Sequence, residues 1–332
     1  MADAAAPRAV GLLGAGVIGA GWAARFLLHG VDVRVFDPDP RGREHVRSAV
    51  ENARRAFATL ITAPLPTEGR LTISASPEDA ARGADFVQES VPEREELKRD
   101  LLAAAGSVTP ESVVIASSTS GLLPSRLQTG VPHPGRVVVG HPFHPVYLLP
   151  LVEVCGGAGT APVAIERAER AYRAVGMAPL RVRKEIDGFV ADRLLEALWR
   201  EALWLVADGV ATAGEIDDAI RFGAGLRWSF MGTFLAYRMA GGDAGMRGFL
   251  EHFGPALEWP WTKLVDVPEL TPELVDRIAS QSDAQAAGRS LADLERERDE
   301  CLVAVIQALR SCGAGAGAVL AAHEARLQDA SG

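Results

Sequence analysis

The chain has 332 residues, of which 48% are hydrophobic and 23% are charged, so it can bury a sizeable core and is not a disordered protein. Its length suggests two domains. The formal net charge of −9 argues against nucleic acid or an anionic membrane as the main partner.

The cysteines and the N-terminal residues bear on the compartment. Three cysteines without a Cys-x-x-Cys pair favour a reducing environment over a disulfide framework. The first residues contain no apolar run typical of a secretory peptide, and no run elsewhere is long enough to span a bilayer. We therefore expect a cytoplasmic protein without a membrane partner.

The first half of the chain alternates β-rich runs with helical periodicity. Helices are expected at Val17–His29 and Arg41–Leu60, among others. Strands are expected at Ala9–Leu13, Asp32–Asp37, Asp85–Glu89, Val113–Ser117, Val137–Gly140 and Leu180–Arg183. Strands that alternate with helices predict βαβ units, and therefore an α/β domain with a mostly parallel sheet.

The second half of the chain has helical periodicity and no clear strand pattern. Asp187 is expected to cap a long helix over Phe189–Asp208. We expect the domain boundary here, with an α/β domain over residues 1–186 and a helical domain over residues 187–332. The low-complexity run Gly313–Gly317 is expected to be a loose linker to a short final helix. Further helices are expected at Thr212–Gly223, Pro272–Ala287 and Ser290–Ser311.

A glycine-rich loop, Gly14-Ala15-Gly16-Val17-Ile18-Gly19, follows the first predicted strand and opens a helix. Gly14 permits a tight turn, Gly16 lets the backbone approach a pyrophosphate, and Gly19 lets the helix pack against the strand. The N-terminus of the helix then offers free N–H groups and a partial positive charge to phosphates. The pattern alone also fits a structural turn, but its position between strand and helix favours dinucleotide binding.

Asp37 ends the second predicted strand, 18 residues after the last glycine of the loop (37 − 19 = 18). A carboxylate at this spacing accepts hydrogen bonds from the adenosine ribose, and it repels the 2′-phosphate of NADP. Arg41 and Arg43 follow closely, but they fall within a helical pattern and are interpreted as solvated helix charges. NAD is therefore the expected cofactor.

His141 and Glu153 are candidates for acid–base chemistry. A histidine suits alcohol oxidation, since it accepts the hydroxyl proton near neutral pH, and a carboxylate can fix its tautomer. Glu153 lies within an apolar, strand-like run and needs a partner if it is buried, although it could equally be an exposed edge residue. His141 and His144 have a spacing that metal sites use, but no cysteine or nearby carboxylate completes such a site, and no metal is expected. The run Ser117–Ser120 follows a strand and either binds substrate or caps a turn.

Longer runs carry a resemblance to a known family. Besides the glycine loop and the strand-end serines, the chain contains His-Pro-Phe-His-Pro-Val from position 141, followed by Leu-Val-Glu, and Gly-Phe-Val-Ala-Asp-Arg-Leu-Leu from position 188. With these runs the chain resembles the 3-hydroxyacyl-CoA dehydrogenase family over nearly its whole length.

The resemblance implies a Rossmann-type N-terminal domain that binds NAD and an all-α C-terminal domain that forms a homodimer. Carried over position by position, it implies that His141 is the catalytic base, that Glu153 is its paired carboxylate, and that Ser120 hydrogen-bonds the reacting oxygen. It implies that Glu93 and Lys98 lie near the nicotinamide end of the cofactor.

Two positions depart from the wider family pattern, which usually has Asn at both. His144 stands at one and Asp192 at the other, so the pocket gains a negative charge that suits a cationic substrate. Longer runs, such as the one that begins at Gly214, resemble the branch of the family that oxidises L-carnitine to 3-dehydrocarnitine. Another 3-hydroxy acid, such as L-gulonate or a 3-hydroxyacyl thioester, is the alternative substrate, and a non-catalytic cofactor-binding protein is the alternative function.

A trimethylammonium group is recognised by aromatic faces and by negative charge. Asp192, Glu196 and Trp199 fall on one face of the long helix at i, i+4 and i+7. We expect them to hold the cation together with Trp228 or Phe230. Such aromatics also commonly fill a core, and Glu196 could simply pair with the arginine four residues later. Two arginines, Arg193 and Arg227, are candidates for the substrate carboxylate.

Overall fold

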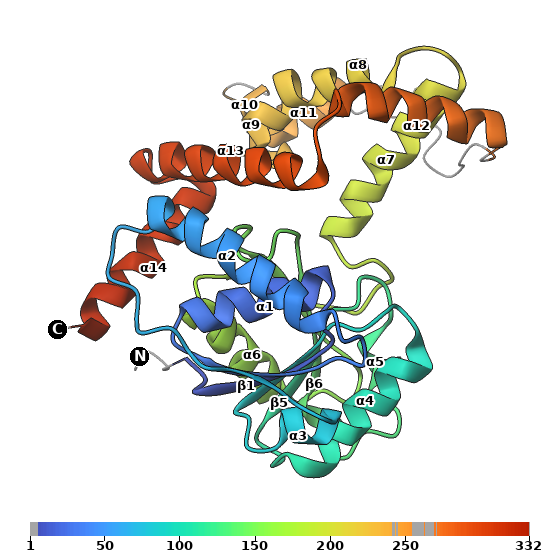
Figure 1. Ribbon diagram of the computed structural model, residues 1–332. Coiled ribbons are helices and arrows are strands. Elements are labelled where there is room, and N and C mark those ends of the chain that lie inside the picture. The colour runs from blue at the N-terminus through green and yellow to red at the C-terminus, as the bar shows by residue number, and fades with distance from the viewer. Residues whose placement is uncertain are drawn as a thin grey trace. The chain divides into compact units, whose positions relative to one another are not determined.

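A computed structural model describes residues 6–240, 243, 245–253, 262, 269 and 271–331 (Figure 1). These residues form two compact units. The first unit contains the chain up to Asp192 and the segment from Asp299 onward, and the second contains Arg193–Arg298. The domain boundary expected between residues 186 and 187 stays a prediction.

The first unit is built on an eight-stranded sheet with the order β3-β2-β1-β4-β5-β6-β7-β8. Neighbouring strands from β3 to β6 are parallel, and β7 and β8 are parallel to each other, but β7 is antiparallel to β6. The sheet is therefore mostly parallel, as predicted. The strands are β1 (Ala9–Leu13), β2 (Asp32–Phe36), β3 (Leu71–Ile73), β4 (Phe86–Glu89), β5 (Val114–Ser117), β6 (Val137–Pro142), β7 (Leu151–Gly156) and β8 (Ala178–Val182).

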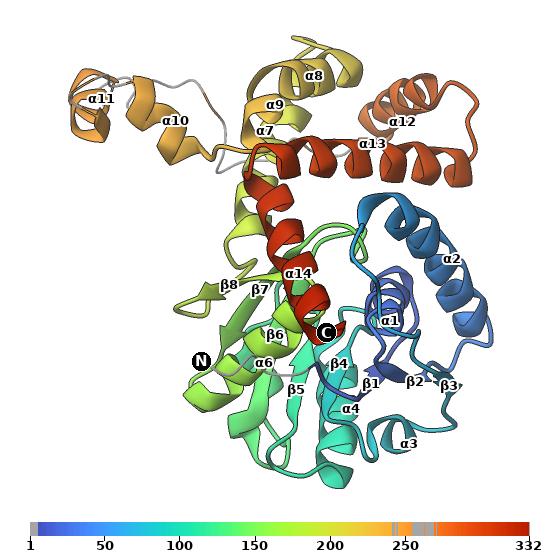
Figure 2. The same ribbon diagram turned by 90° about the vertical axis from the view of Figure 1, so that its left-hand side faces the viewer.

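Helices pack on both faces of this sheet (Figure 1, Figure 2). On one face, Trp22 of α1 stacks on Tyr172 of α6 with ring centroids 5.2 Å apart, in a buried cluster that also includes residues of α2. On the other face, side chains of α3, α4 and α5 form a second buried cluster. The helices are α1 (Val17–Leu28), α2 (Gly42–Leu60), α3 (Pro77–Ala81), α4 (Glu95–Val108), α5 (Pro124–Leu127) and α6 (Pro162–Ala174), with a 3₁₀ turn at Pro134–Arg136.

The last two helices, α13 (Leu291–Ser311) and α14 (Gly315–Ser331), bring the end of the chain back to the first unit. Val303, Ile306 and Leu320 join the buried cluster of α1 and α2. The α14 helix begins inside the low-complexity run, so the loose linker expected over Gly313–Gly317 is wrong. Gly317 instead packs closely on α13, because a Cβ there would lie 2.0 Å from the backbone nitrogen of Arg310.

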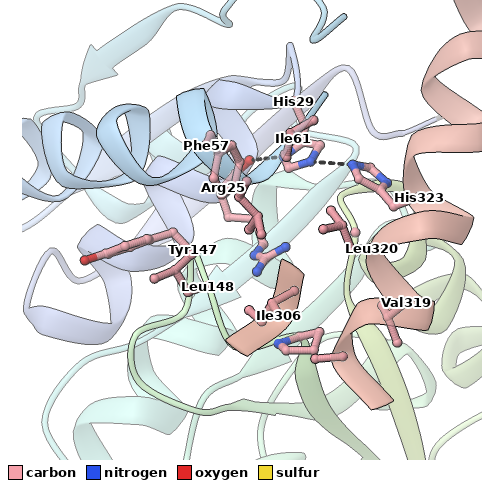
Figure 3. A pocket seen from close by; sticks show the side chains of 14 residues that line it. Arg25, His29, Phe57, Ile61, Tyr147, Leu148, Ile306, Val319, Leu320 and His323 are labelled. Carbon is pink, nitrogen blue, oxygen red and sulfur yellow. Dashed lines mark hydrogen bonds between the residues drawn. The ribbon is translucent and has the colours of Figure 1, made fainter. Parts of the chain in front are cut away.

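A small pocket lies between α14 and the helices α1 and α2. Figure 3 shows the rings of His29 and His323 next to each other in its lining, joined by a hydrogen bond. Their Nε2 atoms lie 2.7 Å apart, and Nδ1 of His29 lies 2.7 Å from the carbonyl oxygen of Arg25. A carbonyl only accepts, so His29 carries its proton on Nδ1, and His323 must then donate from Nε2. His29 is therefore neutral, and burial lowers the pKa of His323 to about 4, so this ring is neutral at pH 7 as well.

The second unit is helical. A capping box begins α8, in which the Thr212 hydroxyl accepts from the backbone N–H of Glu215 and the Glu215 carboxylate accepts from the backbone N–H of Thr212. No single helix of the described ranges is long and apolar enough to cross a membrane, although α13 and α14 would pass as a bent pair by length and composition. The remaining helices are α7 (Ala191–Ala207), α8 (Ala213–Ala219), α9 (Gly225–Trp228), α10 (Thr233–Ala240), α11 (Gly245–Phe253) and α12 (Pro272–Ala286), with a π-helical turn at Ile220–Ala224.

The start of α7 differs from the prediction. The helix begins at Ala191, not at Phe189, and Asp187 does not cap it. Gly188 has φ +70° and Phe189 has φ +48°, so two consecutive residues take the left-handed conformation and cannot belong to a right-handed helix. The side chain of Phe189 is fully buried, which holds this turn in place.

Candidate active site

The parallel strands end at one edge of the sheet, and the expected cofactor and catalytic residues gather there. The glycine loop follows β1, Asp37 follows β2, and His141 lies near the end of β6. In doubly wound sheets, ligands bind outside the carboxyl ends of the strands, where the strand order reverses. In this sheet that position lies between β1 and β4.

The glycine loop has the geometry that a dinucleotide requires. A Cβ at Gly19 would lie 2.0 Å from the carbonyl oxygen of Gly14, so only glycine lets α1 approach the end of β1. Gly16 differs, because a Cβ there would meet nothing within 4 Å, which leaves open space beside the loop. No side chain caps the start of α1, and Gly16 and Val17 at this start are exposed. These residues fit a bound pyrophosphate.

Asp37 supports the same loop. Its Oδ2 accepts a hydrogen bond from the backbone N–H of Ala15 at 2.6 Å, and its Oδ1 accepts from the N–H of Asp39 at 2.8 Å. The nearby Arg41 guanidinium is held by the carboxylate of Asp39, with Nη2 and Oδ2 2.7 Å apart. The arginine that could favour a 2′-phosphate is therefore already paired.

His141 and Glu153 face each other across the antiparallel pair β6–β7. The Nδ1 of His141 lies 3.0 Å from Oε2 of Glu153, so the expected pairing of the two residues is confirmed. Strand β6 extends to Pro142, beyond the expected end at Gly140, because its last residues pair with β7. The histidine is only 4% exposed and the glutamate is fully buried.

Glu153 also caps the start of α7. Its Oε1 accepts hydrogen bonds from the backbone N–H groups of Val190 and Ala191, both at 2.9 Å. Burial alone would raise the pKa of Glu153, but the hydrogen bonds from His141 and from these two amides outweigh it, and the pKa is lowered. The carboxylate is therefore ionised at neutral pH and can stabilise an imidazolium.

A second carboxylate lies on the other side of the imidazole. The Oδ2 of Asp192, in the first turn of α7, is 3.6 Å from Nε2 of His141. The ring centroids of Phe143 and Phe189 lie 5.1 Å and 5.8 Å from that of the imidazole. His141 thus lies between two carboxylates, with aromatic rings beside it.

Glu93 and Lys98 belong to a cluster with a third residue, Glu89. The Lys98 ammonium lies 2.9 Å from Oε1 of Glu89 and 3.2 Å from Oε2 of Glu93, and it donates to the carbonyl of Val91 at 3.0 Å. Lys98 and Glu89 are buried, while Glu93 is half-exposed. Burial raises the pKa of Glu89, although the hydrogen bonds from Lys98 and Ser117 oppose it. Sequence reasoning missed Glu89, since as the last residue of a strand it carries no local signal of a buried ion pair.

Ser120 lies in the exposed loop after β5, the strand next to that of His141. Glu93 holds this loop, because its Oε1 accepts from the hydroxyl of Thr119 and from the N–H of Gly121. Burial would raise the pKa of Glu93, but the hydrogen bonds from Thr119 and Lys98 lower it overall. The cluster therefore ties the loop that carries Ser120 to the end of β4.

The other residues expected to bind the cation, Glu196, Trp199, Trp228 and Phe230, belong to the second unit. Glu196 lies 3.7 Å from Arg200 on α7, which is the salt bridge that the sequence offered as the alternative. Trp199, Trp228 and Phe230 are exposed aromatic side chains, at 53%, 38% and 50%. They are therefore not core residues of that unit. Among the described residues, no group of three or more His, Cys, Asp or Glu side chains could hold a metal ion.

An open glycine loop at the strand switch point and a buried histidine–carboxylate pair at the same edge of the sheet define the class of dinucleotide-dependent dehydrogenases. Two family models cover most of the chain: "3-hydroxyacyl-CoA dehydrogenase, NAD binding domain" over residues 9–186, and "3-hydroxyacyl-CoA dehydrogenase, C-terminal domain" over residues 188–282. The chain belongs to the 3-hydroxyacyl-CoA dehydrogenase family, and its cofactor is NAD.

Individual relatives are similar over most of the chain. It is 58% identical over 305 residues to the L-carnitine dehydrogenase of Pseudomonas putida, covering 92% of this chain and 95% of that protein. It is 54% identical to the L-carnitine dehydrogenase/betainyl-CoA thioesterase of Ruegeria pomeroyi, covering 96% of this chain but only 65% of that protein. Among solved structures, an NAD⁺-dependent 5-formyl-3-hydroxy-2-methylpyridine 4-carboxylic acid 5-dehydrogenase is similar, with TM-score 0.75, 28% identity and coverage of 91% of this chain and 98% of that chain.

Proposed function

We propose that this protein oxidises L-carnitine to 3-dehydrocarnitine, with NAD as the hydride acceptor. The main observation for alcohol oxidation is the contact between His141 and Glu153, because a buried imidazole fixed by a carboxylate can take the proton of a secondary alcohol. The names of the relatives support the substrate, since proteins at 54% and 58% identity are called L-carnitine dehydrogenases.

In this proposal, His141 is the general base. Glu153 accepts the hydrogen bond from Nδ1–H, which leaves the lone pair of Nε2 free to accept the proton of the 3-hydroxyl group. The ionised Glu153 then stabilises the imidazolium. Ser120 is proposed to hydrogen-bond the reacting oxygen from the loop after β5. The cofactor supplies the acceptor for the hydride that leaves C3.

The cofactor-binding residues are proposed to be those of the glycine loop (Gly14, Ala15, Gly16, Val17, Ile18 and Gly19), together with Asp37, Glu93 and Lys98. The loop and the start of α1 would hold the pyrophosphate, and Asp37 would hold the adenosine ribose. Glu93 and Lys98 would lie toward the nicotinamide. The ion pair between them and the contact of Glu93 with the loop of Ser120 support that assignment.

The trimethylammonium group is proposed to bind near Asp192, since this carboxylate lies 3.6 Å from the nitrogen that faces the reacting hydroxyl group. In carnitine the cation is attached one carbon away from that hydroxyl-bearing carbon. Glu196, Trp199, Trp228 and Phe230 are proposed as further contacts to the cation. Each suitable aromatic face would contribute about 0.5–2 kcal/mol of binding free energy.

The assembly and the location are also proposals. A homodimer through the helical domain (residues 187–332) would cover apolar side chains that are exposed on this chain. Leu194 and Leu195 of α7 are 67% and 55% exposed, and Phe234 of α10 is 82% exposed. A cytoplasmic location follows from the cysteine content and from the need for NAD.

A direct test measures NADH absorbance when the purified protein receives NAD and L-carnitine. We expect NADH formation with L-carnitine and little with D-carnitine, L-gulonate or a 3-hydroxyacyl thioester at equal concentration. Faster turnover of one of the other substrates would overturn the choice of carnitine. NAD binding without turnover of any of them would instead favour the non-catalytic alternative.

A further inference from the structure

We infer that Asp192 takes the proton from Nε2 of His141 after each hydride transfer and passes it to solvent. This inference rests on the proposed function, because it concerns the proton that alcohol oxidation leaves on the catalytic base. It gives Asp192 a role in turnover in addition to its proposed contact with a cationic substrate.

The proton balance of the reaction requires such an exit. When a secondary alcohol is oxidised, the C–H bond breaks and its electron pair moves as hydride to the nicotinamide, which becomes reduced. The O–H bond also breaks, a C=O bond forms, and the proton moves to Nε2 of His141. One proton therefore stays on the imidazole in every cycle, and it must leave before the base can act again.

The Nδ1 side of the imidazole offers no exit. Nδ1 faces Glu153, whose side chain is fully buried, and the second oxygen of that carboxylate is already held by the N–H groups of Val190 and Ala191. A proton transferred to Glu153 would therefore have no water to reach. It would also remove the charge that orients the ring.

The Nε2 side offers an exit through Asp192. Its Oδ2 lies 3.6 Å from Nε2 and its side chain is 24% exposed, compared with 5% for that of His141. Within the part of the chain that the structure describes, Glu153 and Asp192 are the carboxylates within 4 Å of the imidazole nitrogens. A small rotation of Asp192 or one bridging water closes the remaining distance. Nε2 must face the substrate oxygen during hydride transfer, so the transfer to Asp192 belongs to the interval after the ketone has left.

The test uses Asp192→Asn, which keeps the size and shape of the side chain but removes the proton acceptor. Stopped-flow fluorescence would follow NADH formation from NAD and L-carnitine at fixed pH and ionic strength. We expect a rapid first turnover of about one NADH per site, followed by a steady state slowed by about tenfold or more. The steady-state rate should rise with the concentration of a small diffusible base such as imidazole, while the unsubstituted protein should not respond.

Two matched variants complete the experiment. Asp187→Asn removes an exposed carboxylate from the turn just before α7, and it should behave as the unsubstituted protein does. Asp192→Glu keeps the carboxylate and should restore most of the steady-state rate without added base.

Several results would overturn the inference. In Asp192→Asn, a steady-state rate equal to the first-turnover rate would contradict the role of Asp192 as proton acceptor. A steady-state rate that does not change with added base would contradict it as well. A raised KM for L-carnitine with a slow first turnover and no response to base would leave Asp192 with the cation contact alone. If the unsubstituted protein forms no NADH from L-carnitine, the proposed function fails and the inference falls with it.

Discussion

The Nδ1 of His141 lies 3.0 Å from Oε2 of Glu153, and the other oxygen of that carboxylate holds the first N–H groups of α7. One buried side chain therefore fixes the tautomer of the proposed base and the start of the helix that carries Asp192. A change at Glu153 should affect both the chemistry and the folding stability, whereas a change at His141 should affect mainly the chemistry.

Replacing the base should slow turnover strongly and leave cofactor binding intact. For His141→Asn we expect kcat to fall by roughly 10²–10⁴-fold, the usual contribution of a positioned acid–base group. The Kd for NAD, measured by fluorescence titration, should change by less than about twofold. The glycine loop and Asp37 follow β1 and β2, whereas His141 lies in β6. A variant that keeps full turnover would contradict the proposed role of His141.

Glu153→Gln should lower both activity and stability. The amide can accept at one oxygen only, so either Nδ1–H of His141 or the two amides of α7 lose their acceptor. An unsatisfied buried donor costs about 1–3 kcal/mol of unfolding free energy, which urea denaturation would measure. We also expect kcat to fall by about tenfold or more, since the tautomer is no longer fixed.

The pH dependence of Glu153→Gln provides an internal check. The folded-state pKa of Glu153 lies below its ordinary value of 4.5, so the stability that it adds is fully present above that value. This stability is lost as the pH falls through the folded-state pKa. The deficit of the variant should therefore be constant from pH 7 to 5 and should shrink in stronger acid. A deficit that is unchanged by acid would contradict the charged role of Glu153.

Local patterns in the sequence predicted most of the sheet and the cofactor loop. The spacing of Gly14, Gly16 and Gly19, and the position of Asp37 at the end of the next strand, are set by a single βαβ unit and can be read over short distances. The end of β6 could not be predicted from local patterns, since His141 and Pro142 have the composition of a loop. They become strand residues only because β7 pairs with them.

The contacts that build the candidate site are mostly non-local. Glu153 caps α7 from 37 residues away in the sequence, and no local rule would choose it over Asp187 as the cap. Glu89 likewise gains its partner Lys98 only when α4 packs beside β4. The resemblance to a family named Lys98 and Glu93, but the buried partner Glu89 is recognised only in the structure.

The His29–His323 contact should make the protein sensitive to mild acid. Burial is the main cause that lowers the pKa of both imidazoles, for His323 to about 4, and the nearby Arg25 cation lowers both further. The folded protein keeps both rings neutral, while the unfolded chain takes up protons below pH 6.5, so stability falls as the pH drops below 6.5. For His323 this loss ends near pH 4 and amounts to about 3 kcal/mol of unfolding free energy.

Urea denaturation at pH 7 and pH 5 would measure this loss. His323→Gln keeps a donor that can reach Nε2 of His29 but does not titrate, so we expect the difference between the two pH values to shrink by about half. Charges that face the pair come from Arg25 on α1 and Arg326 on α14. Burial lowers the pKa of Arg25 only to about 9, so its charge does not change between pH 7 and pH 5. His133→Gln, at a half-exposed histidine, should leave the difference unchanged. An equal loss in His323→Gln and the unsubstituted protein would contradict the assignment.

Asp37 should set the preference for NAD over NADP. In Asp37→Asn the amide oxygen can still accept from Ala15 N–H, so the glycine loop keeps this support while the charge and the hydrogen bond from Asp39 N–H are lost. Losing one charge-assisted hydrogen bond to the ribose, about 1.5–3 kcal/mol, should lower kcat/KM for NAD by roughly ten- to a hundredfold. The value for NADP should rise or stay level, because a 2′-phosphate no longer meets a carboxylate. Asp39→Asn is the matched control, since it frees Arg41 and should improve NADP without weakening NAD. An equal loss of kcat/KM for NAD and NADP in Asp37→Asn would mean that Asp37 supports only the loop and does not bind the ribose.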